Sequence, residues 1–306
     1  VRMWRITGQP NYPYSLMFYH LALREQFLHH MENLHSPEYI KAFSERFLAD
    51  KFKTHPGQLS DETTQKMRTF VFAHELLGVA YQIDALGMKT EEFRIALSQA
   101  KNYLNTLNSA EFLSDPRLVK YFAPQVVNYV FQLKSFGGED LEEQLTSIFK
   151  TIFVPEKDSQ LDQLAYENKL YGLTHFIIAG SNYYQNYASA EKYRWILDYF
   201  DNEIDSIMKR SKRDLIAEVG LCFKLCQLKN HKAVSLTQRI IREAFDPKLG
   251  IIPHEEGTVH LSVGEHLNVM AYLLLIEFEK LHAGPDLKKI PEMNFLFKDI
   301  VNNAAK

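Results

Sequence analysis

Four residues in the second half of the chain have side chains suited to acid–base chemistry. His175 lies within the apolar stretch LTHFIIAG, Glu218 lies within AEVGLCF, and Glu265 and His266 follow Gly264. An imidazole titrates near neutral pH, and burial raises the pKa of a carboxyl group so that it can donate a proton. We therefore predict that Glu218, His175 and His266 are the acid or base groups. In the alternative interpretation these are core groups that satisfy one another's hydrogen bonds.

Further polar and aromatic side chains could complete a ligand site around these groups. Tyrosines follow the His175 segment, a histidine lies in the long loop DPKLGIIPHEEGTVHLSVG, and a His-Glu pair lies near residue 75. Paired carboxylates or histidines beside aromatic rings are typical of proteins that process glycans. A small molecule or glycan is therefore the predicted ligand. The candidate ligand-binding residues are His74, Glu75, His175, Tyr183, Tyr184, Glu218, His254, Glu265 and His266.

The sequence provides little support for a metal site or a reactive thiol. His175, His266 and Glu218 would make an acceptable zinc set, but their spacing matches neither HExxH nor CxxC, so no cofactor is predicted. Cys222 and Cys226 lie four residues apart on an expected helix and are interpreted as packing residues. His29, His30 and His35 are interpreted as a surface patch, because their spacing is no ligand pattern.

Composition limits the classes of function. The 306 residues are 46% hydrophobic and 24% charged, which is typical of a soluble globular protein. A net charge of −3 gives no electrostatic case for binding nucleic acid. No apolar run approaches the roughly 20 residues of a membrane span. The chain begins with Val1, which leaves open both a cleaved leader and a segment of a longer chain. Cytoplasmic and exported locations, and the oligomeric state, stay open.

Helical periodicity is nearly continuous, and Pro, Gly, Asn or Ser interrupts it roughly every 20–25 residues. The pattern predicts an all-α protein with about twelve helices and a single domain spanning residues 1–306. The expected helices cover 15–33, 36–54, 61–86, 91–107, 115–136, 139–153, 162–185, 189–209, 214–228, 233–245 and 265–281, and the last begins near 291.

Alternate helices differ in how their apolar residues are distributed. The second, fourth and later even-numbered helices have one apolar side, whereas the odd-numbered ones are apolar nearly all round, as two concentric layers require. Polar residues interrupt the odd-numbered helices about every 50 residues, the length of a helical-hairpin repeat. These interruptions are His20, His74, Gln125, His175, Glu218 and His266. Glycines at 78, 172 and 220 predict close approach between helices, since mid-helix glycine is otherwise unfavourable.

Six helical hairpins closing into a ring form the (α/α)6 toroid. KLYGLTHFIIAG, RDLIAEVGLCFKLCQL and GEHLNVMAYLLLIEF resemble inner-helix segments of bacterial toroid domains of unknown function. The segment from DPKLGIIPHEEG to GEHLNVMAYLLL is similar to repeats of terpenoid cyclases and prenyltransferases, and the architecture resembles that of toroid glycosidases. This resemblance implies a central cavity lined by the inner helices. The DDxD motif and the zinc-binding Cys-His pattern of those enzymes are missing from the chain.

Three functional hypotheses follow. The first is a toroid that binds or processes a small molecule or glycan in its central cavity. The second is a non-catalytic scaffold or interaction module whose polar groups only pair with one another. The third, a prenyl- or terpenoid-type enzyme, is disfavoured because Lys169, Lys212 and Arg213 are the only basic residues available for a phosphate. The sequence leaves open whether the protein is an enzyme.

Overall fold

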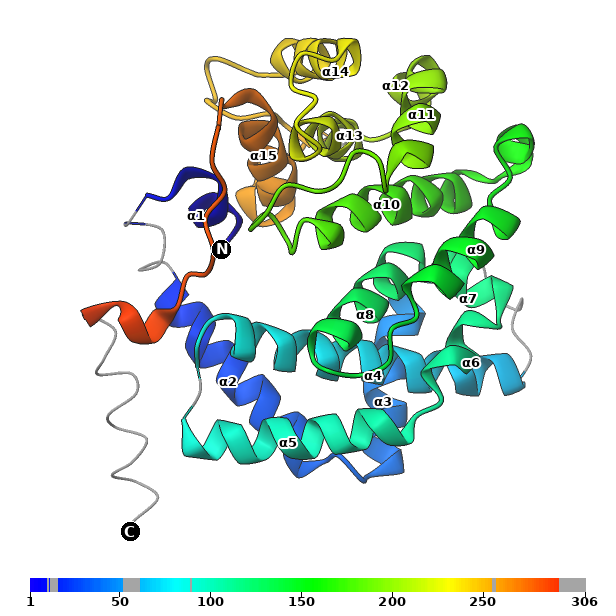
Figure 1. Cartoon of the computed structure of the whole chain (residues 1–306), viewed down its shortest axis with the longest axis vertical. Helices are drawn as coiled ribbons and strands as arrows, with labels where there is room; N and C mark the ends of the chain where they lie inside the picture. The colour runs from blue at the N-terminus through cyan, green and yellow to red at the C-terminus, as the bar shows by residue number, and fades with distance from the viewer. Residues whose placement is uncertain (10, 12–15, 52–60, 89, 255–256, 292–306) are drawn as a thin grey trace. The chain divides into compact units, whose positions relative to one another are not determined.

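The computed structural model describes residues 1–9, 11, 16–51, 61–88, 90–254 and 257–291. These residues form helices joined by turns and loops, with no β-strand among them; one isolated bridge joins Asp246 and Ile251. The prediction of an all-α protein is therefore confirmed (Figure 1). No helix in this part of the chain is long and apolar enough to cross a membrane.

The chain divides into two compact units. The first unit comprises Val1, Pro10–Ile152 and Gly284–Lys306, and the second comprises Arg2–Gln9 and Phe153–Ala283. Arg2–Gln9, which include the short helix α1, thus belong to the second unit although they precede most of the first unit in the sequence. The single-domain organisation and the closure of six hairpins into a ring stay predictions.

In the first unit, α4 is the central helix. It packs against α2, α3, α5 and α8, as the ribbon view also shows (Figure 1). Aromatic side chains such as Phe70 and Phe72 on α4 are buried in this core. The helices of this unit are α2 (Leu16–Glu32), α3 (Pro37–Lys51), α4 (Asp61–Ala85), α5 (Glu91–Thr106), α6 (Ser109–Leu113), α7 (Pro116–Tyr121), α8 (Ala123–Ser135) and α9 (Glu142–Ile152), followed near the C-terminus by the 3-10 helix η3 (Leu287–Lys289).

Helix caps explain several boundaries in this unit. The Ser36 hydroxyl accepts the Tyr39 backbone N–H at 3.2 Å, and the Asp115 carboxylate accepts that of Arg117 at 2.9 Å. The predicted helix over 115–136 is nevertheless wrong in extent, because the chain breaks at Phe122 into α7 and α8. Pro124 lies in the first turn of α8, where its missing N–H costs no helical hydrogen bond.

His30 on α2 is buried, so its assignment to a surface patch is wrong. It is 2% exposed, and its Nδ1 lies 2.9 Å from the Tyr39 hydroxyl. The rings of Phe43 and Phe72 pack edge-on against its imidazole. Burial, reinforced by the nearby charge of His29, lowers the pKa of His30 from 6.5 to about 4.

This buried imidazole predicts a loss of stability in mild acid. The unfolded chain takes up a proton at His30 below pH 6.5, whereas the folded chain does so only near pH 4. The free energy of unfolding should therefore fall as the pH drops from 6.5 to about 4. Urea denaturation of wild type and His30→Gln across this range measures the effect, which the variant should largely lack. His35→Gln is the control, since that side chain is exposed and does not contribute to the His30 pKa shift; an equal change in both variants would contradict the assignment.

In the second unit, α13 is the central helix. Every residue from Leu215 to Leu225 is buried, and α13 packs against α10, α11, α14 and α15 (Figure 1). By contrast, α14 buries one side, as expected of an outer helix. The elements of this unit are α1 (Arg2–Thr7), the 3-10 helix η2 (Pro155–Gln160), α10 (Gln163–Gly180), α11 (Arg194–Asn202), α12 (Ile204–Arg210), α13 (Arg213–Leu225), α14 (Lys232–Glu243) and α15 (Leu261–Leu275).

Two predicted helices of this unit end earlier than expected. The helix predicted over 162–185 ends at Gly180, and the next residues form a turn in which Asn182, Tyr183 and Tyr184 have φ of 51°, 53° and 71°. The Ser181 hydroxyl accepts the Tyr184 backbone N–H at 2.9 Å and holds this left-handed turn.

The helix predicted over 265–281 runs instead from Leu261 to Leu275. The buried Lys224 ammonium donates to the carbonyls of Leu274 and Ile276 and so caps its carboxyl end. The helix predicted over 189–209 is divided between α11 and α12, and the one expected from 291 falls almost wholly outside the described residues.

Candidate functional site

A buried glutamate connects α10, α13 and α15 of the second unit. Glu218 on α13 is 2% exposed. Its Oε2 accepts a hydrogen bond from the Thr174 hydroxyl of α10 at 2.7 Å, and its Oε1 lies 3.2 Å from Nε2 of His266 on α15. The polar residues that sequence periodicity placed on successive apolar helices, Glu218 and His266, are thus in direct contact.

The second ring nitrogen of His266 contacts the N-terminal helix. Its Nδ1 lies 3.1 Å from Nη1 of Arg2 on α1. A guanidinium group only donates hydrogen bonds, so Nδ1 must accept this one, and the neutral ring carries its proton on Nε2. That proton is then donated to Glu218. The His266 side chain is 39% exposed, so a solute can reach the imidazole.

A second carboxylate faces the same imidazole. Asp214 lies one helical turn before Glu218 on α13, a spacing that places both side chains on one face. Its Oδ2 accepts the Tyr171 hydroxyl proton at 2.7 Å and lies 3.8 Å from Nε2 of His266. Asp214 is more exposed than Glu218, with 19% of its side chain accessible against 3%.

The two carboxyl groups have pKa values shifted in opposite directions. Burial acts to raise the pKa of Glu218, but the His266 hydrogen bond, the charges of His175 and His266 and the Thr174 hydrogen bond together lower it below its usual value. The expectation that burial would raise the pKa of Glu218 is therefore wrong. Burial raises the pKa of Asp214, because the Tyr171 hydrogen bond and the His266 charge, which act to lower it, do not offset the effect of burial. The pair thus combines an ionised carboxylate with one that protonates more readily.

The groups around His266 favour its protonated form. The hydrogen bond to Glu218 raises the pKa of His266, opposed mainly by burial. Since the folded pKa lies above the unfolded value of 6.5, this pair stabilises the fold fully below pH 6.5, and the contribution is lost as the pH rises through the folded pKa.

The predicted tyrosines adjoin this site in different ways. Tyr184 is 3% exposed, and its pKa is raised by burial, opposed by the charge of Arg2 and reinforced by that of Glu218. Tyr183 contributes its backbone, because its carbonyl accepts a hydrogen bond from the buried Arg5 guanidinium at 2.9 Å. A stack of both rings on a sugar stays a prediction.

Other predicted site residues lie elsewhere. Glu265 is exposed, and as a helical neighbour it points about 100° away from His266. His254 lies in the loop before α15, where its backbone N–H donates to the Thr258 carbonyl at 3.0 Å. His74 and Glu75 belong to α4 in the first unit, where Glu75 accepts a hydrogen bond from Gln26 and burial raises its pKa.

Four contributors to this site were missed by the sequence interpretation: Arg2, Tyr171, Thr174 and Asp214. The spacing of Tyr171, Thr174 and His175 matches one face of a helix and could have indicated the α10 group. Asp214 precedes Glu218 by one turn and could have been found in the same way. Nothing in the sequence connects Arg2 with His266.

Metal and thiol chemistry gain no support from these contacts. Among the described residues, no three His, Cys, Asp or Glu side chains, and so not the set of His175, His266 and Glu218, are placed to hold a metal ion. Cys222 is fully buried, its thiol lies 3.7 Å from the Thr174 carbonyl, and burial raises its pKa well above the usual value. A thiol in this state packs rather than reacts.

The basic residues considered for a phosphate are occupied by other contacts. Lys169 is 2% exposed and its ammonium binds the Asp158 carboxylate at 2.6 Å. Lys212 pairs with Glu167 at 2.9 Å, and Arg213 donates to the Pro253 carbonyl at 3.1 Å. Prenyl- or terpenoid-type chemistry stays a disfavoured prediction.

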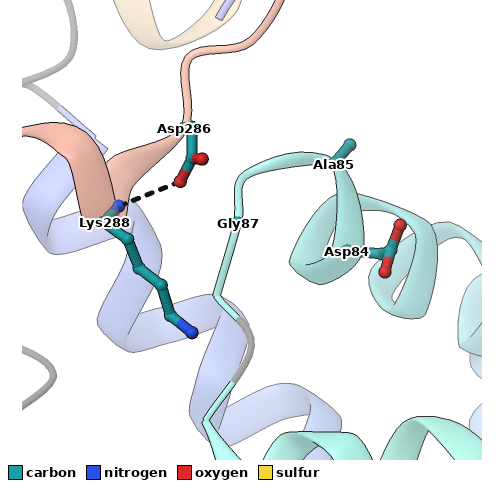
Figure 2. A pocket seen from close by; sticks show the side chains of 5 residues that line it. All are labelled: Asp84, Ala85, Gly87, Asp286 and Lys288. Atoms are coloured by element: carbon teal, nitrogen blue, oxygen red, sulfur yellow. Dashed lines mark hydrogen bonds between the residues drawn. The ribbon is translucent and has the colours of Figure 1, made fainter.

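Two pockets are lined by residues other than Glu218 and His266. In the first unit, a pocket of about 230 Å³ is lined by Asp84, Ala85, Gly87, Asp286 and Lys288 (Figure 2). Gly87 has φ of +70°, and a Cβ there would lie 2.1 Å from Oδ1 of Asp286, so this turn requires glycine. In the second unit, a pocket of about 400 Å³ includes Ile6, Tyr272, Phe278, Glu277, Glu279 and His282.

Fold and site together define an all-helical protein with a Glu–His–Asp cluster on its central helices. The chain belongs to the family described as domain of unknown function (DUF3541), whose model matches residues 1–303. The searches of curated proteins and of solved structures found no match. The family therefore assigns no activity, and the resemblance to toroid enzymes stays a prediction.

Proposed function

We propose that the chain binds a small polar molecule or glycan at the Glu218–His266–Asp214 site and processes it by acid–base chemistry, within a fold of the α/α-toroid type. The observation that carries the proposal is an accessible imidazole whose Nε2 lies 3.2 Å from a buried carboxylate. This arrangement fixes the tautomer and orientation of a histidine that exchanges protons.

The residues divide into positioning and reacting groups. Glu218 is too buried to touch a ligand and acts through His266, so it is a positioning residue. Nδ1 of His266 is the ring atom that takes up a proton. Asp214, with its raised pKa and partial exposure, is the group suited to donating one, and Tyr171 orients it.

Glu218→Gln should abolish ligand binding or turnover with little change in melting temperature. The amide oxygen can still accept the His266 proton, and the amide N–H can donate to Thr174, whose hydroxyl proton then goes to the Tyr171 carbonyl 3.0 Å away. Hydrogen bonds are retained and only the charge is lost, so the His266 pKa should fall. An NMR titration of the histidine ring protons measures this change.

Binding is measured by thermal shift with a panel of neutral, amino and acidic sugars, and turnover with p-nitrophenyl glycosides. Glu265→Gln is the matched control, because it makes the same change in an exposed carboxylate next to His266. The control should keep the wild-type His266 pKa and ligand response. A large drop in melting temperature for Glu218→Gln would make Glu218 structural and contradict the proposal.

A non-catalytic interaction module is the second candidate. The observation that favours it is that Thr174, His266 and Tyr171 already donate hydrogen bonds to the two carboxylates. An interaction module predicts that Glu218→Gln lowers the His266 pKa and that no sugar or glycoside binds to either the variant or the wild type.

A further inference from the structure

We propose that Arg2 and His266 form a proton-coupled site for the carboxylate or phosphate group of an anionic ligand. The inference deepens the proposed function, on which it rests, by naming the class of ligand. Its geometric basis is the contact between Nη1 of Arg2 and Nδ1 of His266, 3.1 Å apart.

In the neutral state this contact is a hydrogen bond from Arg2 to the imidazole. Nε2 donates to Glu218 on the opposite side of the ring, so both nitrogens are satisfied by the protein. Arg2 has exposed surface, and a guanidinium carries five N–H donors, so further donors are available beyond the one that His266 uses.

Protonation of His266 makes its contact with Arg2 repulsive. Nδ1 then carries a proton that points at a guanidinium N–H, and the two groups have the same charge. An oxygen of a carboxylate or phosphate placed between them accepts from both and neutralises the repulsion. The proton therefore creates an anion site from two groups that are otherwise paired with each other.

The carboxylates of α13 make proton uptake a requirement for anion binding. Glu218 and Asp214 face Nε2, at 3.2 and 3.8 Å, and favour the charged imidazole. With His266 neutral, the two acidic groups beside its ring outweigh the charge of Arg2, the cation that contacts the ring, and disfavour a further anion. With His266 charged, the positive groups balance them, and the anion lies on the Nδ1 side of the ring, away from the carboxylates.

The groups around His266 on the other elements are consistent with this assignment. From α1, Arg5 adds a buried positive charge bound to the Tyr183 carbonyl, and α10 presents Tyr171 and His175 near the carboxylates. The loop before α15 carries His254 and the Pro253 carbonyl, which accepts from Arg213. The α14 side chain that bonds to α15 is Gln238, which has no charge.

The test is calorimetric titration of the full chain with sodium sulfate and with sodium acetate at several pH values. Sulfate represents a phosphate group without titrating in this range, and acetate represents a carboxylate, so the stronger binder distinguishes the two sources. Above the His266 pKa, affinity should fall about tenfold per pH unit, with uptake of one proton per anion. An affinity independent of pH, or no binding of either anion, would overturn the proposal.

Variants separate this inference from the proposed function. Arg2→Gln and His266→Gln should each abolish the pH-dependent binding, whereas Arg239→Gln, which removes an exposed arginine of α14, should not. In Glu218→Gln anion binding should be lost at neutral pH and should return only at lower pH, because the His266 pKa falls. If wild type binds neutral sugars but no anion, and Glu218→Gln loses the sugar binding, only the anion site is overturned. If wild type binds anions but Glu218→Gln does not change the response to the sugar panel, only the proposed function is overturned.

Discussion

Replacing Asp158 with asparagine should lower the free energy of unfolding of the second unit by about 3–5 kcal/mol, the usual cost of leaving a buried charge without its partner. Asp158 lies on η2, and both of its carboxylate oxygens accept from the Lys169 ammonium of α10, at 2.6 and 2.8 Å. The Tyr199 hydroxyl of α11 donates to the same carboxylate at 2.6 Å. One carboxylate thus connects three elements of this unit.

The cost arises mainly from Lys169. Its side chain is 2% exposed, and burial lowers its pKa, opposed by the hydrogen bond and charge of Asp158. Asparagine removes the opposing charge and presents an N–H where a donor needs an acceptor. The Tyr199 ring, whose centroid lies 4.0 Å from Nζ, offers only part of the lost attraction.

Urea denaturation of wild type, Asp158→Asn, Lys169→Met and the double variant measures this coupling. The double variant should be more stable than Asp158→Asn, because it contains no buried ammonium, and well-packed apolar replacements of buried ion pairs are often neutral. If the two single changes add without interaction, the proposed coupling between Asp158 and Lys169 is wrong.

Most of the fold could be predicted because its signals are local. Ser36 and Asp115 cap helices where the sequence indicates, and apolar periodicity located α4, α10 and α13 within a few residues. Boundaries set by distant side chains could not be found in this way. The end of α15 is capped by Lys224, which lies 50 residues away in the sequence from Leu274.

In the site, too, features set by local sequence could be predicted and features set by distant residues could not. Glu218 and His266 could be predicted because each is a polar interruption in an apolar helix, and such a group needs a partner at the same depth. The sign of the Glu218 pKa shift depends on which donors surround it, and that requires coordinates. Arg2 could not be predicted at all, since 264 residues separate it from His266.

Gly220→Ala should destabilise the second unit by about 1–3 kcal/mol, the range for overpacked cores. A Cβ on this residue of α13 would lie 2.1 Å from the Thr237 hydroxyl oxygen of α14 and 2.8 Å from Leu274 of α15. The Thr237 hydroxyl is held by the carbonyls of Ala233 and Val234, so rotating it away leaves its hydrogen bonds unmade. The sequence-based expectation of close helix approach is thereby confirmed at Gly220, and it is wrong at Gly78, where the nearest atom to a Cβ would lie 3.9 Å away.

Gly78→Ala is the matched control, because it makes the same change inside α4 and is expected to stabilise the protein rather than destabilise it. Its nearest neighbour would be Oε1 of Gln132 at 3.9 Å, an ordinary contact, so the gain in helix propensity of about 1 kcal/mol should dominate. Thermal unfolding and hydrogen exchange of the α13 amides measure both variants. Adding Thr237→Ala to Gly220→Ala removes the clashing oxygen and should recover stability relative to Gly220→Ala. Equal effects at the two glycines would show that helix propensity, rather than the contact of α13 with α14 and α15, determines the outcome at Gly220.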